Sequence, residues 1–185
     1  MRKLVLASRN VNKLRELRRA LPGWEIELLE AEDEPEETGD TFLDNARLKS
    51  RFGRERADAG VWVAGEDSGI EVAALGGRPG VRSARWTGDP VHRLIAALDG
   101  EDDRRARYVC ELVALSPAAE EVRATGTLEG TIALDPRGSE GFGYDPIFVP
   151  FGETRTVAEL GNEWKSENSH RALAARALAE KLSHG

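Results

Sequence analysis

The chain has 185 residues and a formal net charge of −7, which disfavours a general nucleic-acid or anionic-membrane binder, because phosphate backbones are held mainly by clustered Lys and Arg. Hydrophobic residues make up 40% and charged residues 32%, which is typical of a folded globular protein and argues against a disordered one. We expect one domain over residues 1–185, since no repeat or linker composition divides the sequence.

Cysteine usage and the N-terminal stretch bear on the compartment. A single cysteine, Cys110, excludes an intramolecular disulfide, and three histidines do not favour a structural zinc site. The opening MRKLVLASRN starts basic, but its apolar run is far shorter than that of a secretion signal. No segment approaches the ~20 apolar residues of a membrane span. We therefore expect a cytoplasmic protein with no membrane partner.

Strands and helices alternate in the first half of the sequence, which is typical of an α/β protein. Hydrophobic spacing predicts strands over 3–7, 24–30 and 61–66 and helices over 11–21 and 41–59, the second bent near Gly53, with an exposed acidic loop over 31–40. The second half is more antiparallel. Its pattern predicts a helix over 91–100, two strands over 105–115 and 121–134 around a turn at Pro117, and a final helix over 169–182.

Two predicted helices begin with cations. Asn10 is an N-cap candidate and Lys13 falls in the first turn that follows, while Ser169 is the N-cap candidate before His170 and Arg171. A cation in a first helical turn opposes the helix dipole. This pattern predicts an anion or an electron-rich ligand between the two helix starts, although an ordinary cap and a solvated charge explain Lys13 alone.

Polar residues on the second predicted helix allow two interpretations. Thr41 and Asp44 have the spacing of a capping box, which would fully explain Asp44. Asn45 and Lys49 are four residues apart and lie on one helix face, where Lys49 could reach a phosphate group. A solvated helix face explains the same pair.

The stretch GEDSGIEVAALGGRPGVRSARW places two acids at the end of a predicted strand. If the strand continues, the side chains of Glu66 and Asp67 lie on opposite faces, so that one of them points into a cleft. A hard cation such as Mg²⁺ prefers one or two carboxylates with waters and substrate phosphates, and Glu37 in the acidic loop could supply the second carboxylate. The alternative is a structural turn with glycines that serve a tight loop.

Two aromatic residues occupy the glycine-rich stretch GFGYDP. Phe142 and Tyr144 suit stacking on a nucleobase, but core anchors of a turn have the same pattern. The sequence contains no GxxxxGK[ST], GxGxxG or GxSxG motif, so the common nucleotide-binding and hydrolase signatures are absent.

Read in order, these stretches resemble the inosine triphosphate pyrophosphatase family, the noncanonical purine nucleoside triphosphate pyrophosphatases. The resemblance is carried by LVLASRNVNKLREL, EETGDTFLDNARLKS, EDSGIEVAALGGRPGVRSARW, GFGYDPIFVP and TVAELGNEWKSENSHRALA, and it spans nearly the whole chain. It implies a mixed α/β fold with a long central twisted sheet flanked by helices, two lobes around an active-site cleft, and a homodimer. It also implies hydrolysis of ITP, dITP and XTP to the monophosphate and pyrophosphate with Mg²⁺.

The resemblance also implies roles for residues at matching positions. Asp67, Lys13 and Lys49 would be catalytic, and Glu37 and Asp67 would bind the metal. The substrate contacts implied for the triphosphate and its surroundings are Ser8, Arg9, Asn10, Val11, Asn12, Lys13, Lys49, Ser68, Ser83 and Arg85. Those implied for the base pocket are Phe142, Gly143, Tyr144, Asp145, Lys165, His170 and Arg171.

Three positions depart from the family pattern. Glu66 stands where the family usually has Asp, and Asp44 and Trp164 stand where it usually has Glu. Two other functions remain open, the second of them because of these departures. One is a pyrophosphatase for another modified nucleotide, and the other is a nucleotide-binding module without turnover. A purely structural acidic protein would leave the cations of these motifs unexplained.

Overall fold

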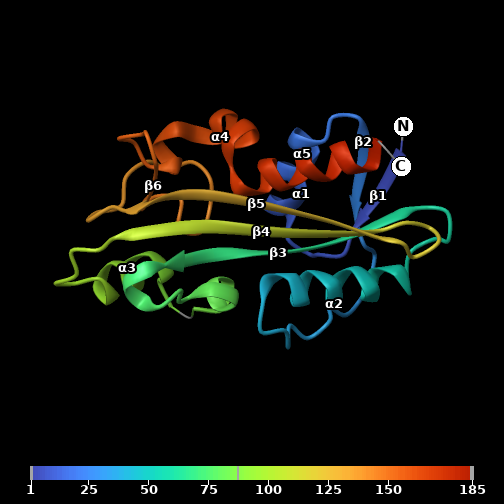
Figure 1. Cartoon of the computed structure of the whole chain (residues 1–185), viewed down its shortest axis with the longest axis horizontal. Coiled ribbons are helices and arrows are strands. Elements are labelled where there is room, and N and C mark those ends of the chain that lie inside the picture. The colour runs from blue at the N-terminus through green and yellow to red at the C-terminus, as the bar shows by residue number, and fades with distance from the viewer. Residues whose placement is uncertain (1, 87, 184–185) are drawn as a thin grey trace.

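A six-stranded mixed sheet in the order β2-β1-β3-β4-β5-β6 forms the centre of the computed structural model, which describes residues 2–86 and 88–183 (Figure 1). The strands are β1 (Arg2–Leu6), β2 (Trp24–Leu28), β3 (Trp62–Val72), β4 (Arg105–Leu115), β5 (Glu121–Ile132) and β6 (Phe148–Pro150). The helices are α1 (Val11–Ala20), α2 (Phe42–Arg54), α3 (Pro90–Ala97), α4 (Val157–Asn168) and α5 (His170–Ser183), with short 3₁₀ turns η1 (Ala73–Leu75) and η2 (Gly80–Arg85).

Both predicted halves of the fold are present. β1 pairs in parallel with β2 and β3, whereas β3, β4, β5 and β6 pair antiparallel in succession. Helices α1, α4 and α5 lie on one side of the sheet and α2 on the other (Figure 1). The structure is therefore a mixed α/β sheet flanked by helices.

β3 corrects the largest error in the sequence prediction. The strand does not end near residue 66 but continues through the glycine-rich stretch to Val72, because it pairs with β4 from Val63 to Val72. Ladder hydrogen bonds and burial thus outweigh the turn preference of these glycines. Glu66 and Asp67 lie in mid-strand, on opposite faces, as a continuing strand requires.

Other boundaries are shorter than predicted, and two elements were missed. The strand predicted over 24–30 ends at Leu28, the helix predicted over 41–59 ends at Arg54, the helix predicted over 91–100 ends at Ala97, and the strand predicted over 121–134 ends at Ile132. The missed elements are β6 and α4. Helix α4 starts with a full capping box between Thr156 and Glu159 and contains a kink at Gly161, where φ is 87°.

Caps explain where the other helices begin. Asn10 Oδ1 accepts hydrogen bonds from the N–H groups of Asn12 and Lys13, and Ser169 Oγ accepts one from Ala172, so both predicted N-caps are confirmed. The box predicted at α2 is incomplete. Thr41 Oγ1 accepts from the Asp44 N–H, but Asp44 accepts from the Thr41 hydroxyl in return rather than from the Thr41 backbone.

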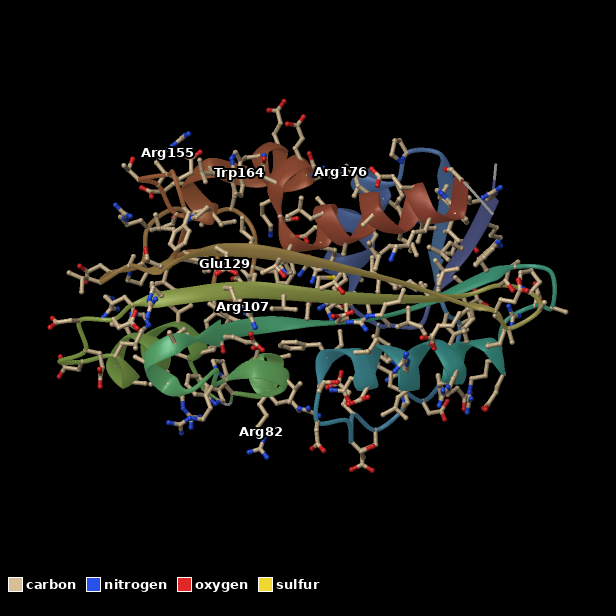
Figure 2. The ribbon with its side chains drawn as sticks, viewed as in Figure 1. Arg82, Arg107, Glu129, Arg155, Trp164 and Arg176 are labelled. Carbon is tan, nitrogen blue, oxygen red and sulfur yellow. The ribbon has the colours of Figure 1, made fainter. Side chains whose placement is uncertain are left out.

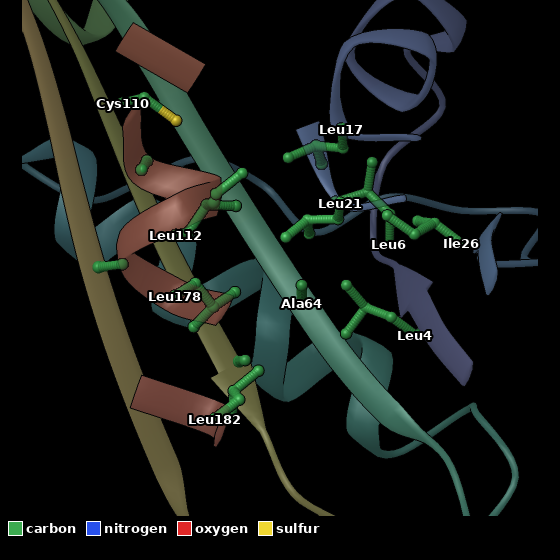
Figure 3. Close-up of a cluster of buried hydrophobic side chains, with 14 of the residues drawn as sticks. Leu4, Leu6, Leu17, Leu21, Ile26, Ala64, Cys110, Leu112, Leu178 and Leu182 are labelled. Atoms are coloured by element: carbon green, nitrogen blue, oxygen red, sulfur yellow. The ribbon is translucent and has the colours of Figure 1, made fainter. Parts of the chain in front are cut away.

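Two hydrophobic clusters lie at different points along the same long strands. The first joins β1, α1 and α5 to Ala64 of β3 and Leu112 of β4 (Figure 3). The second joins α3, β6 and the start of α4 to Ile70 of β3 and Tyr108 of β4. The strand segment with Glu66 and Asp67 therefore lies between the two clusters.

Glycines allow two helices to approach the sheet beside this segment. A Cβ on Gly65 of β3 would lie 2.0 Å from the Ala46 carbonyl oxygen of α2, and one on Gly126 of β5 would lie 2.0 Å from the His170 carbonyl oxygen of α5. Any larger side chain would push these helices away. Among the described residues, no helix is long and apolar enough to cross a membrane.

Candidate active site

A cleft of about 250 Å³ lies between the two hydrophobic clusters, beside β3. β1 pairs with β3 only from Trp62 to Ala64, and Ser83 contacts the backbone of β3 again at Ile70, so the residues between them leave a short open sheet edge at this cleft. The residues that line it are Asn10, Lys13, Glu37, Asp67, Ser68, Gly69, Val81, Ser83, Ala84, Pro90, Tyr108, Phe142, Gly143, Tyr144, Asp145, Lys165, His170 and Arg171. Residues from both halves of the sequence thus meet at one sheet edge.

Asp67 faces α2 and is surrounded by polar groups of that helix. Its Oδ1 accepts a hydrogen bond from Lys49 Nζ at 2.9 Å, and its Oδ2 accepts one from Asn45 Nδ2 at 3.1 Å. Burial raises the pKa of Asp67 above its ordinary value, because Lys49 only partly offsets the lost hydration and the Glu66 charge adds to the rise. A carboxylate with a raised pKa at a cleft can accept a proton from water.

Glu66 is fully buried on the opposite face, and cations from two helices contact it. Lys13 Nζ lies 2.5 Å from Oε2, and Arg171 donates to Oε1 through Nε at 3.1 Å and Nη2 at 3.0 Å. Burial opposes the charged form, but Lys13 and Arg171 outweigh it and hold the pKa of Glu66 well below its ordinary value. Glu66 is itself an anion between the two helix starts, where the sequence pattern predicts an anion or an electron-rich ligand.

Glu37 comes from the acidic loop between β2 and α2 and meets Asp67 through a shared lysine. Lys49 Nζ lies 2.5 Å from Glu37 Oε1 as well as 2.9 Å from Asp67 Oδ1. Arg85 contacts the other Glu37 oxygen at 3.2 Å. Burial opposes the charged form of Glu37, yet Lys49 and Arg85 lower its pKa. The two carboxylates therefore converge on one point at the cleft.

The carboxylates of Glu37 and Asp67 are candidate ligands for a metal ion. Within residues 2–86 and 88–183, no group of three or more His, Cys, Asp or Glu is arranged to hold one. A hard divalent cation that keeps waters and binds phosphate oxygens needs only one or two carboxylates. The oxygen donors of Glu37 and Asp67 fit that chemistry, and they do not fit a site made by protein ligands alone.

A second group of charges lies at the other end of the cleft. Lys165 Nζ lies 2.7 Å from Asp145 Oδ2 and 2.6 Å from Glu16 Oε1, and Arg171 also donates to Glu16. Asp145 further accepts from the Phe142 N–H at 2.8 Å. Burial raises the pKa of Asp145 although Lys165 opposes the rise. This network fixes the glycine-rich stretch against α1, α4 and α5.

Aromatic rings line the same end. The Tyr108 and His170 rings stack with centroids 4.5 Å apart, and Lys165 Nζ lies 4.6 Å from the centroid of the half-buried Phe142 ring. Burial, together with the nearby Arg171 charge, lowers the pKa of His170 to about 3, so its imidazole is neutral near pH 7. His170 Nδ1 is buried without a hydrogen-bond partner. Flat rings and an unpaired ring nitrogen can hold and read a planar heterocycle.

Tyr144 and Ser83 have structural contacts. The Tyr144 hydroxyl donates to the Ser83 carbonyl oxygen at 3.0 Å, and Tyr144 belongs to the second hydrophobic cluster. Ser83 Oγ accepts from the Ile70 N–H at 2.9 Å and so ties η2 to the edge of β3. For Tyr144 the structure favours the core anchor, whereas Phe142 lies open to the cleft.

Some residues implied by the resemblance do not line the cleft. Ser8, Arg9, Val11 and Asn12 surround the start of α1, and Val11 is exposed. Lys49 and Arg85 reach the site through their ion pairs with Glu37. Arg82, in the same turn as Arg85, points away from the protein (Figure 2).

Three residues of the site were not assigned a role from the sequence. Glu16 balances Lys165 and Arg171, Tyr108 stacks on His170, and Asn45 donates to Asp67. Glu16 is three residues after Lys13, so helical spacing would have placed it on the same face. Tyr108 carries no comparable signal, because its place depends on the register between β4 and β3.

A mixed sheet with a cleft at a free strand edge, buried cations, paired carboxylates and an aromatic pocket defines a nucleotide-binding protein equipped for phosphate chemistry. Comparison with known proteins is more specific. Residues 4–181 match the model of the Ham1 family, and the chain belongs to this family.

Relatives and solved structures agree with this assignment. The chain is 44% identical over 190 residues to a protein of Gloeobacter violaceus named dITP/XTP pyrophosphatase, with 100% of this chain and 96% of the relative covered. The structure of the Staphylococcus aureus Ham1 protein superposes with a TM-score of 0.87 at 35% identity and covers 99% of both chains. A nucleoside-triphosphatase / dITP/XTP pyrophosphatase from Mycobacterium abscessus gives a TM-score of 0.74 at 44% identity, with 97% and 98% covered.

Proposed function

We propose that this protein hydrolyses noncanonical purine nucleoside triphosphates, namely dITP, ITP and XTP, to the monophosphate and pyrophosphate. The observation that carries the proposal is the convergence of Asp67 and Glu37 on Lys49 at the cleft, where burial raises the pKa of Asp67. A carboxylate with a raised pKa beside a second carboxylate and a cation is typical of sites for acid/base chemistry on phosphates. The names of the relatives from Gloeobacter violaceus and Mycobacterium abscessus support the substrate class.

In the proposed reaction a water molecule attacks the α-phosphorus. A bond forms between the water oxygen and phosphorus while the bond to the bridging oxygen of pyrophosphate breaks, and Asp67 accepts the proton from the attacking water. Lys13 and Lys49 offset the negative charge of the triphosphate from α1 and α2. Mg²⁺ held by Glu37 and Asp67 would supply further charge neutralisation.

The aromatic end of the cleft would bind the base. Phe142 offers a face for stacking, and His170 Nδ1, when it carries the proton of the neutral ring, would donate to the 6-keto oxygen of hypoxanthine or xanthine. Arg171 is largely committed to Glu66, Glu16 and Ser68 and therefore mainly shapes the pocket. A 6-amino group would place a donor against a donor, which disfavours adenine.

The remaining features of the proposal concern assembly and location. We propose that the chain acts as a single domain over residues 1–185 and as a homodimer in the cytoplasm. The continuous sheet supports the first point, and the single buried thiol of Cys110 supports a reducing compartment. The homodimer rests on the resemblance alone.

The test is chromatographic quantification of products from dITP, ITP and XTP, with ATP and GTP as controls, in the presence and absence of Mg²⁺. We expect monophosphate and pyrophosphate only with the metal, and a loss of about 10³-fold in kcat for Asp67→Asn. Glu71→Gln is the matched control, because Glu71 lies on the same strand face but pairs with Arg107 outside the cleft. Release of a single phosphate, or tight binding without turnover, would contradict the proposal.

A further inference from the structure

Arg9 lies between β1 and α1, in the segment that the resemblance assigns to the triphosphate, yet its contacts are with the acidic loop between β2 and α2. Its backbone N–H donates to Glu34 Oε1 at 2.9 Å. Its guanidinium donates to the carbonyl oxygen of Ala31 at 3.3 Å and also to that of Glu32. Arg9 is not among the residues that line the cleft.

The loop that Arg9 contacts carries many like charges. Its acids between β2 and Glu37 are Glu30, Glu32, Asp33, Glu34, Glu36 and Glu37. Mutual repulsion favours an extended, moving loop unless cations hold it. Arg9 holds the first half of the loop, while Lys49 and Arg85 hold Glu37 at its other end.

Packing agrees with a fixed loop. Leu29 and Pro35 of the loop lie beside Ala7, Arg9 and Phe52, and the cavity between them measures about 10 Å³. A space of this size holds at most one water molecule. The first half of the loop is therefore seated against the end of β1 and α2.

We propose that Arg9 is a positioning residue for Glu37: it fixes the first half of the acidic loop so that Glu37 meets Lys49 and Asp67 at the cleft. Arg9 therefore acts through the loop and does not bind the triphosphate. The consequence for the metal rests on the proposed function, because it takes Glu37 as a ligand, whereas the hold on the loop does not depend on it.

The first measurement follows the loop directly and needs no turnover. A glutamate-specific endoproteinase would be applied to protein without metal or nucleotide, and cleavage after residues 30–37 would be followed by mass spectrometry. We expect Arg9→Ala to be cleaved about three- to tenfold faster than wild type, because two charge-assisted hydrogen bonds are lost. Arg9→Lys should be intermediate, since it keeps the positive charge but loses the longer, planar guanidinium that reaches both carbonyl oxygens through Nη2.

The matched control is Arg56→Ala. Arg56 pairs with Asp33 of the same loop at 3.3 Å, but it holds a side chain only, whereas Arg9 donates to two backbone carbonyl oxygens of the loop. We expect its cleavage rate to stay near that of wild type. Circular dichroism melting of each variant confirms that the fold is retained.

The second measurement separates the two roles of Arg9. Calorimetric titration of the nucleotide-free protein with Mn²⁺ should show a Kd about three- to tenfold higher in Arg9→Ala, while KM for dITP at saturating Mg²⁺ stays unchanged. Unchanged cleavage with a raised KM for dITP would overturn the proposal and assign Arg9 to the phosphates. Unchanged cleavage with unchanged KM would overturn it as well. If wild type fails to hydrolyse dITP, the proposed function falls, and cleavage still decides whether Arg9 holds the loop.

Discussion

Glu66 and Asp67 are neighbours on β3, but their carboxylates lie on opposite faces and are held by different helices. Lys13 of α1 and Arg171 of α5 contact Glu66, whereas Lys49 and Asn45 of α2 contact Asp67. The pKa of Glu66 falls and that of Asp67 rises. One strand thus presents, on one face, a carboxylate that two cations hold in its charged form and, on the other, a carboxylate whose raised pKa suits the proposed proton acceptor.

Neutralising these two acids should affect stability differently. Glu66→Gln leaves Lys13 and Arg171 without their shared anion, so we expect a loss of about 3 kcal/mol in the free energy of unfolding. Asp67→Asn removes a charge that burial already disfavours, so we expect a change below about 1 kcal/mol. Urea denaturation at neutral pH measures both. Equal losses in the two variants would contradict the division of roles.

Phe142 should contribute to substrate affinity rather than to folding. Its ring is half-buried at the cleft, near Lys165. We expect Phe142→Ala to raise KM for dITP about tenfold, as the loss of one stacking face does, with an unfolding free energy close to that of wild type. Phe151→Ala is the control. Phe151 directly follows β6 and is exposed, so this variant should leave KM for dITP unchanged. An unchanged KM in Phe142→Ala would place the base elsewhere.

Gly126 should be intolerant of even one added methyl group. Its Cβ would lie 2.0 Å from the His170 carbonyl oxygen, so Gly126→Ala must displace the start of α5. We expect a loss of about 2 kcal/mol in stability and a lower kcat/KM, since His170 and Arg171 move with the helix. Gly23→Ala serves as control, because a Cβ there meets nothing within 4 Å. Similar stabilities of the two variants would show that α5 can shift without cost.

His170 should make stability depend on pH. Its folded pKa of about 3 lies below the ordinary 6.5, so the unfolded chain binds the proton more readily. The contribution of the neutral His170 to the free energy of unfolding is fully present above pH 6.5. It is lost as pH falls from 6.5 towards 3, by up to about 1.4 kcal/mol for each pH unit. Comparing denaturant midpoints of wild type and His170→Gln at about pH 5 and pH 7.5 isolates this contribution. An identical pH dependence in both proteins would show that His170 is protonated when folded.

Local sequence signals predicted much of the fold. Asn10 and Ser169 mark helix starts that the structure confirms, and two β-rich runs around a turn predicted β4 and β5. The continuation of β3 to Val72 was not predictable in this way. Its glycines favour turns locally, and only pairing with β4 makes them strand residues.

The candidate site likewise has one part that could be predicted from the sequence and one part that depends on tertiary packing. Carboxylates and cations could be proposed from their residue types and from the resemblance. Their pairing could not, because Lys13, Glu66 and Arg171 meet only when α1, β3 and α5 are packed together. Arg9 shows the same limit, since its proximity to the acidic loop depends on how β1 and β2 lie side by side.

The arrangement of the two hydrophobic clusters has a mechanical consequence. β3 and β4 run without interruption through both clusters, so no flexible linker separates the two halves of the molecule. Any movement of one cluster against the other must twist or bend these strands, and the segment of β3 between the clusters carries Asp67. A nucleotide that contacts the residues around both clusters would therefore restrict this twisting and make the protein more rigid at the place where its phosphates react.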